Sequence, residues 1–156
     1  MSKAKPITYA TTKDTILAEL LTPNPEIARI VSYHAHIYFR TPEERATAEQ
    51  IRTQIADRFS VQLGRWHDTL VGPHAAPMYQ VAFAPEIFPS FVPWLMLNRQ
   101  NLTILLHPNS GEPRRDHQLH AVWFGEVLAI MNPERLPETS EDDETVSPNT
   151  HPRPAG

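Results

Sequence analysis

The chain has no cysteine and no long apolar run, and each shortage excludes a class of protein. Without cysteine among its 156 residues it can form no disulfide, thiolate nucleophile, iron–sulfur cluster or thiolate-bound zinc site. No apolar stretch approaches the ~20 residues of a membrane helix, and residues 1–14 lack the apolar core of a secretory signal. We therefore expect a cytoplasmic protein in which any metal is bound through nitrogen and oxygen atoms.

The sequence also lacks several well-known nucleotide-binding and catalytic motifs. The sequence contains no glycine-rich phosphate loop, no G-x-S-x-G elbow and no H-E-x-x-H pair, which disfavours nucleotide binding and serine hydrolysis. Residues 132–156 hold six acids and two arginines, which accounts for the whole net charge of −4. The rest of the chain is neutral overall, so it offers no electrostatic basis for binding nucleic acid or an anionic membrane.

Histidine, by contrast, is abundant, with eight residues in the chain. Residues 33–40 read Tyr-His-Ala-His-Ile-Tyr-Phe-Arg, and in a strand successive side chains point to opposite faces. One face would then be apolar, while the other would carry His34, His36, Tyr38 and Arg40. Two imidazoles on one face of a strand indicate a contact with a metal, a substrate or a partner subunit.

Hydrophobic periodicity predicts one domain over residues 31–131. Thr41 and Pro42 predict the start of a helix, and Ser90 is expected to cap a second helix so that Pro93 lies in its first turn. The predicted elements are strand 31–39, helix 42–59, strands 61–67 and 78–84, helix 91–98, strand 102–107 and a final edge strand 127–131.

This order, β-α-β-β-α-β, is the split βαβ arrangement of a ferredoxin-like α+β sandwich with an antiparallel sheet. Both helices would cover one face of the sheet and leave the other face open for a site or a second subunit, which predicts a homodimer. Residues 112–118 are expected to form a charged loop. An N-terminal extension (residues 1–30) and a disordered, acidic, proline-rich tail (residues 132–156) would flank the domain.

The strand pattern places His107 on the open face together with His34 and His36. His117 and His120 can close over the same point if their loop makes a helical turn. A divalent first-row metal with open positions needs only three protein ligands, which this set supplies. The alternative interpretation is that these histidines are ordinary side chains, each with its own hydrogen bonds.

Six segments of the chain resemble the DOPA 4,5-dioxygenase family, in the same order and at similar spacing, and together they cover about residues 31–131. They are YHAHIYF (33–39), GRWHDTLVGPH (64–74), MYQVAF (78–83), FVPWLMLNR (91–99), LTILLHPNSG (102–111) and DHQLHAVWFGE (116–126). The chain departs from the family pattern at Ser110, where the motif HPNTG is usual, and at Ala75, where a proline often follows GPH. Neither position is an expected ligand.

The resemblance implies extradiol cleavage of a catechol ring, such as that of DOPA or a related catecholic acid, by a non-haem iron enzyme that uses O₂. The expected cofactor is Fe(II), with zinc or another divalent metal as an alternative occupant in the purified protein. Its expected ligands are His36, His107 and His120, with His34 as the closest substitute.

His67 or His74 would be the acid–base group, and Arg65 or Arg40 would anchor a carboxylate of the substrate beside Tyr38. Tyr38 and Arg40 have a second interpretation as a solvated or dimer-facing surface. Two other hypotheses remain for the whole chain: a non-catalytic metal- or small-ligand-binding dimer of the same fold, and a cofactor-free or haem-using oxygenase. The number of histidines makes the last of these less attractive.

Overall fold

The structure, a computed structural model, describes residues 25–154, so most of the predicted N-terminal extension lies outside the described residues. No helix in the described range is long and apolar enough to span a membrane. The elements run in the order η1 (Ile27–Arg29), β1 (Ser32–Tyr38), α2 (Pro42–Arg58), β2 (Gln62–His67), β3 (Met78–Phe83), η2 (Pro85–Ile87), α3 (Phe88–Asn98), β4 (Ile104–Asn109), α4 (Pro113–Gln118), β5 (Val122–Phe124) and η3 (Pro133–Arg135), where η marks a 3₁₀ helix.

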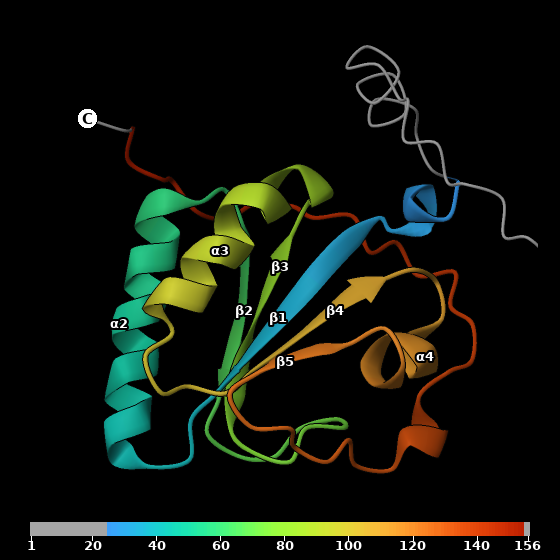
Figure 1. The fold of residues 1–156 in the computed structure, drawn as a ribbon, viewed down its shortest axis with the longest axis horizontal. Helices are drawn as coiled ribbons and strands as arrows, with labels where there is room; N and C mark the ends of the chain where they lie inside the picture. Colours follow the sequence, from blue (N-terminus) through green and yellow to red (C-terminus); the bar gives the residue numbers. More distant parts are fainter. Residues whose placement is uncertain (1–24, 155–156) are drawn as a thin grey trace, which may run out of the picture.

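Within residues 25–154 the strands form one antiparallel sheet of five, in the order β2-β3-β1-β4-β5. The first four strands with α2 and α3 make the predicted ferredoxin-like α+β fold, and β5 adds an edge strand. Figure 1 shows α2 and α3 near each other and α4 apart from them, next to β4 and β5. Because β1 lies between β3 and β4, its two faces determine what the centre of the molecule contains.

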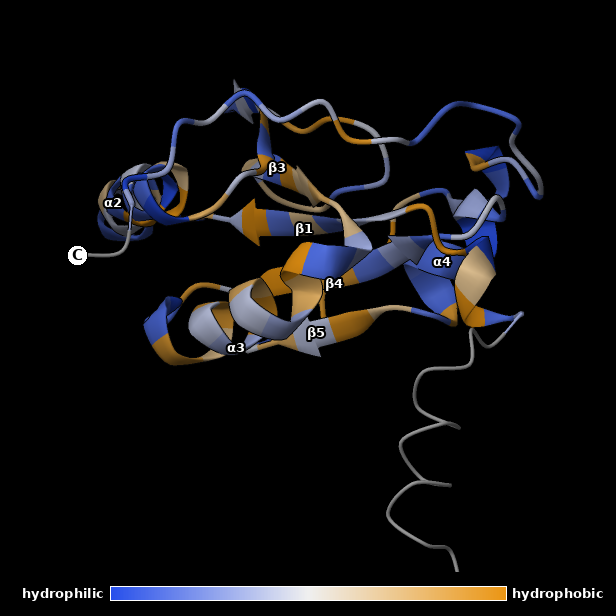
Figure 2. Ribbon diagram, turned by 90° about the horizontal axis from the view of Figure 1, so that it is seen from above, coloured by the Kyte–Doolittle hydropathy of each residue, from blue (hydrophilic) through white to orange (hydrophobic). Residues whose placement is uncertain are grey.

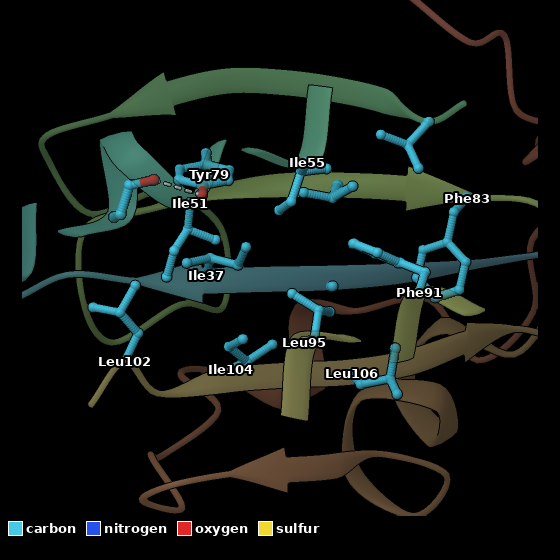
Figure 3. Packing of buried hydrophobic residues seen from close by; sticks show 14 of the residues in the cluster. Ile37, Ile51, Ile55, Tyr79, Phe83, Phe91, Leu95, Leu102, Ile104 and Leu106 are labelled. Atoms are coloured by element: carbon cyan, nitrogen blue, oxygen red, sulfur yellow. Dashed lines mark hydrogen bonds between the residues drawn. The ribbon is translucent and has the colours of Figure 1, made fainter. Parts of the chain in front are cut away.

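One face of the sheet carries the main apolar core, which α2 and α3 cover. Ile37 of β1, Ile51 of α2 and Leu95 of α3 are almost completely buried there (Figure 3). The Tyr79 hydroxyl donates a hydrogen bond to the Ala48 carbonyl at 2.8 Å, the dashed line in Figure 3. This bond ties β3 to α2 and satisfies a polar group inside the core.

The start of α2 follows the predicted pattern. The Thr41 hydroxyl accepts a hydrogen bond from the Glu44 backbone N–H at 3.1 Å, and Pro42 occupies the first helical position. The Glu44 carboxylate accepts in turn from the Arg40 backbone N–H at 2.6 Å, one residue before the cap. The chain direction after β1 is therefore fixed by the sequence of this turn.

The predicted start of the second helix was wrong. The backbone passes from η2 through Ile87 and Phe88 in right-handed helical conformation, so α3 begins at Phe88. Ser90 is not a cap; its hydroxyl donates to the Ile87 carbonyl at 3.0 Å. Pro93 therefore lies inside α3, where its missing N–H removes one helical hydrogen bond. Figure 2 shows the contrast between the largely apolar α3 and the hydrophilic α4.

The chain after the fourth strand also differs from the prediction. β4 extends to Asn109 because this residue pairs with Ser32, and its amide donates to the Ser32 hydroxyl at 2.8 Å. Residues 113–118 form α4 instead of a loop, since Pro113 provides a helix-compatible first turn.

The final edge strand is Val122–Phe124 and not residues 127–131. In that later stretch Ile130 forms a single bridge with His74. Leu128 and Ile130 pack with Trp123 against a second apolar cluster, which includes Tyr38 and Leu105 on the face of the sheet away from α2 and α3. Part of the face that was expected to be open is thus covered by the chain itself.

The segment expected to be a disordered tail follows a defined course, and we call residues 137–153 the C-terminal segment. The Ser140 N–H donates to the Gly111 carbonyl at 2.9 Å. Farther along, the Asn149 side chain accepts from the Leu63 N–H at 2.8 Å and donates to the Leu63 carbonyl at 3.0 Å. These bonds satisfy backbone groups of the edge strand β2. The homodimer stays a prediction, although the open face that motivated it is partly occupied.

Candidate metal centre

β1 and β4 bring three imidazoles together on the sheet face away from α2 and α3. His34 and His36 lie on this face of β1, and His107 lies directly across from His34 in the β1–β4 register. The Nε2 atoms of His36 and His107 are 3.1 Å apart, and both residues are almost fully buried, with 2% and 1% of their surface exposed. The alternation of the strand therefore delivers the predicted H-x-H pair to a partner on the neighbouring strand.

The loop between β2 and β3 adds a fourth imidazole. The ring centre of His74 lies 4.1 Å from that of His36. The Tyr38 hydroxyl and His74 Nδ1 are 2.7 Å apart and share a buried hydrogen bond. The bridge between His74 and Ile130 fixes the backbone of the loop at this point. Tyr38 thus positions His74 instead of facing solvent.

α4 adds a fifth imidazole, His117. Its ring centre lies 4.0 Å from that of His107. His117 Nδ1 donates to the Pro113 carbonyl at 2.8 Å, one turn earlier in the helix. We refer to the five residues as the histidine cluster, which consists of His34, His36, His74, His107 and His117.

Two overlapping trios in the histidine cluster have the spacing of a metal site. The first is His34, His36 and His107, and the second is His36, His74 and His117; in each, one ligand atom per residue lies within 4.8 Å of the others. Two imidazole nitrogens bound to one metal at about 2.1 Å lie roughly 3.0–3.4 Å apart. The 3.1 Å between the Nε2 atoms of His36 and His107 fits this range.

The histidine cluster is electrostatically prepared for a cation. Burial is the main cause that lowers the pKa of His34 and of His74 to about 4, and neighbouring imidazoles lower them further. The pKa values of His36, His107 and His117 are also lowered, again mainly by burial. These rings are therefore neutral at pH 7, which is the form that binds metals.

Backbone carbonyls orient two of these rings. His107 Nδ1 donates to the Pro108 carbonyl at 2.9 Å, in the same way that His117 Nδ1 donates to Pro113. Each bond leaves Nε2 with its lone pair toward the cluster, the usual arrangement of metal-binding histidines. His36 Nδ1 is buried with no hydrogen-bond partner among the described residues, so the described side chains do not fully satisfy this ring. The residues present therefore fit a divalent metal ion.

His120, a predicted ligand, is not part of either trio. It follows the end of α4, and its Nδ1 contacts the Asp116 carboxylate at 2.9 Å. Asp116 is 2% exposed and also accepts two hydrogen bonds from Ser110, through the backbone N–H and the hydroxyl. The helical turn that the His117–His120 spacing required does form, but it ends before His120 and presents only His117 to the cluster.

The other predicted site residues lie at the margins. His67 ends β2 outside both trios, although it lowers the pKa of His74 slightly. Arg40 follows the far end of β1 from His34 and pairs with Glu44 and Glu126. Arg65 is exposed on β2.

One residue near the cluster had no signal in the sequence. Glu144 of the C-terminal segment places a carboxylate oxygen 3.6 Å from His34 Nε2. Its backbone carbonyl accepts a hydrogen bond from the buried Ser32 hydroxyl at 2.5 Å. Four consecutive acids, residues 141–144, indicate a solvated run, and nothing in their composition distinguishes the one that contacts a histidine.

Comparison with known proteins agrees with this architecture. A protein from Nostoc punctiforme, provisionally described as a dioxygenase, has a crystal structure that matches 71% of this chain and 95% of its own chain, with 46% identity and a TM-score of 0.68. At this identity the likeness extends beyond the fold to the sequence that builds it.

Two fungal proteins are similar in sequence. An uncharacterized 21.2 kDa protein from Botryotinia fuckeliana is 34% identical over 110 residues, which is 64% of this chain and 60% of the relative. A DOPA 4,5-dioxygenase from Amanita muscaria is 30% identical over 125 residues, which is 74% of this chain and 54% of the relative. The chain thus spans little more than half the length of these two relatives.

The family model of the Dopa 4,5-dioxygenase family matches residues 33–132. This range begins at the first residue of the YHAHIYF strand and contains all five residues of the histidine cluster. It ends before the C-terminal segment. The chain belongs to the Dopa 4,5-dioxygenase family.

Proposed function

We propose that the chain is an extradiol ring-cleaving dioxygenase that acts on a catechol, such as DOPA or a related catecholic acid, with Fe(II) held in the histidine cluster. The observation that carries this proposal is the gathering of four neutral imidazoles around that of His36, in two overlapping trios with the spacing of a metal site. Family membership supplies the reaction class.

We assign the metal to His34, His36 and His107, because these residues stand on two central strands and are held more rigidly than residues on loops. Bound Fe(II) would act as a Lewis acid toward the catechol and would activate O₂ for the ring cleavage. The Nε2 atom of His107 is directed to this point by the bond from its Nδ1 to Pro108. His36 is common to both trios, so it is required in either arrangement.

His74 is the acid–base residue in this proposal. It lies against His36, and in this proposal its Nδ1–H donates to the Tyr38 hydroxyl oxygen, which leaves Nε2 unprotonated and able to accept a proton. Because its pKa is about 4, the ring is neutral at pH 7 and can accept a proton from a catechol hydroxyl. His74 is 5% exposed, and Tyr38, which holds its ring, stacks on Trp123 in the second apolar cluster, so water has little access to this imidazole.

The test is anaerobic reconstitution of the full chain with Fe(II), followed by a panel of catechols and O₂. We expect a yellow ring-opened product that forms only when iron and O₂ are both present. Metal analysis should show about one ion per chain, a readout that does not depend on turnover. Metal uptake without product from any catechol would instead support a non-catalytic metal-binding protein.

A further inference from the structure

The C-terminal segment brings a negative charge to the mouth of the histidine cluster. Figure 1 shows this part of the chain, in orange to red, passing the ends of β1 and β4 on its way toward α2. The backbone of Glu144 is held by the buried Ser32 hydroxyl, and its carboxylate lies 3.6 Å from His34 Nε2. The Glu144 side chain is 38% exposed, so it is in contact with both the cluster and the solvent.

The segment is anchored on both sides of Glu144. Before it, the Ser140 N–H is bonded to the Gly111 carbonyl. After it, the Ser147 N–H donates to the Gln62 side chain at 3.1 Å, and Asn149 bonds to β2 through its side chain. Glu144 is thus held in position by hydrogen bonds of the residues before and after it, in contrast to an acid in a solvated segment.

Positive charge is scarce at this end of the sheet. The described residues contain no lysine. Arg29 lines one pocket with His107 and another with Glu144, and its guanidinium is paired with Glu112. The arginines expected to anchor a substrate carboxylate, Arg40 and Arg65, lie elsewhere: Arg40 pairs with two glutamates past the far end of β1, and Arg65 is exposed on β2.

We propose that Glu144 determines substrate specificity, so that the site prefers catechols bearing a protonated amine to catechols bearing a carboxylate. This inference rests on the proposed catechol dioxygenase function. The carboxylate attracts an ammonium group on the ring's side chain and repels a carboxylate, and a partly shielded charge pair at close range changes affinity by about tenfold. Glu144 lies outside residues 33–132, the range that the family model matches.

The experiment compares kcat/KM for dopamine, 4-methylcatechol and 3,4-dihydroxyphenylacetate in the Fe(II)-loaded full chain. In Glu144→Gln we expect the dopamine to dihydroxyphenylacetate ratio to fall about tenfold, mainly through KM, with 4-methylcatechol changed less than about twofold. Glu138→Gln is the matched control, because it removes one charge from the same segment but contacts Arg114 instead of a histidine. Asn149→Ala, which loosens the anchor on β2, should shift the ratio in the same direction as Glu144→Gln.

A binding arm separates this inference from the proposed function. The same three catechols are titrated without O₂ into zinc-loaded wild type and Glu144→Gln, and their affinities are measured by calorimetry. A shifted affinity ratio with no ring-opened product in the kinetic arm upholds the role of Glu144 and overturns the dioxygenase. Formation of product with an unchanged affinity ratio would uphold the dioxygenase and overturn the role of Glu144. If none of the catechols binds, the specificity role is overturned.

Discussion

The two faces of β1 carry out different tasks with alternate residues of one seven-residue strand. Ala35 and Ile37 face α2 and α3 and are fully buried in the main apolar core. His34 and His36 face the other way, into a group of imidazoles whose burial is unfavourable for charge. Stability is therefore concentrated on the face covered by α2 and α3, while the face that carries the histidine cluster buries polar rings that a bound cation would stabilise.

We expect the largest effect from substitutions on the histidine face, the side of the sheet on which His34, His36 and His107 lie. Replacing His36 or His107 by Ala should lower metal affinity more than about 100-fold, because either change removes a ligand from the first trio. His120→Ala is the matched control, since this residue bonds to Asp116 outside both trios. Metal content after dialysis is the measurement. Full retention in both His36→Ala and His107→Ala would place the metal elsewhere.

Ile37, which follows His36 on β1, should show the opposite pattern, with a large loss of stability and little change in metal affinity. Ile37→Ala leaves a cavity between the sheet and the two helices and should lower the free energy of unfolding by about 2–5 kcal/mol. Metal affinity of the folded protein should stay within a few fold of wild type. Urea denaturation together with metal titration checks both expectations. A large loss of metal affinity in Ile37→Ala under conditions in which the variant is folded would show that the two faces of β1 are energetically coupled.

Acid should weaken the histidine face selectively. The pKa values of His34 and His74 are lowered in the folded protein to about 4, so the unfolded chain binds protons first as the pH falls below about 6.5. Each of the two residues should therefore cost the metal-free protein about 1 kcal/mol of stability between pH 6.5 and 5.5, and the loss should level off below pH 4.

Urea denaturation of the metal-free protein at several pH values measures this slope. The double variant His34→Gln, His74→Gln should show a shallower dependence over the same range. A slope that is identical in the double variant and in the wild type would mean that other groups carry the acid sensitivity.

We expect the smallest effect at the edge of the sheet, where the C-terminal segment bonds to β2. Asn149→Ala removes two hydrogen bonds to Leu63 and should lower the free energy of unfolding by about 1 kcal/mol. Its melting temperature relative to that of Glu138→Gln checks this. No change at all would indicate that the segment is held by its other contacts.

The sequence predicted the fold well because its strongest patterns are local. The alternation in residues 33–39 assigned each side chain of β1 to its face, and Thr41 with Pro42 fixed the start of α2. The order of elements then left few arrangements other than the ferredoxin-like sheet. The second helix began earlier than expected because a preceding 3₁₀ turn, which no cap residue marks, continued into it.

The site was harder to predict because it is assembled from distant segments. Periodicity could place His34, His36 and His107 on one face, but not choose between His117 and His120. That choice depended on where a six-residue helix ended and on the buried Asp116, which holds His120 aside. Glu144 depended on hydrogen bonds between residues more than a hundred positions apart, such as the one from Ser32, which composition cannot reveal.

The hydrogen bonds that Asn149 makes with β2, and Thr150 with the residue before it, have a further consequence for handling the protein. They occupy backbone groups of Leu63 and Val61 at an edge where β2 has no neighbouring strand among residues 25–154. A shortened chain that ends before Asn149 would expose this row to strands of other molecules. We therefore expect this truncated protein to precipitate when it is concentrated, although the same protein is folded in dilute solution.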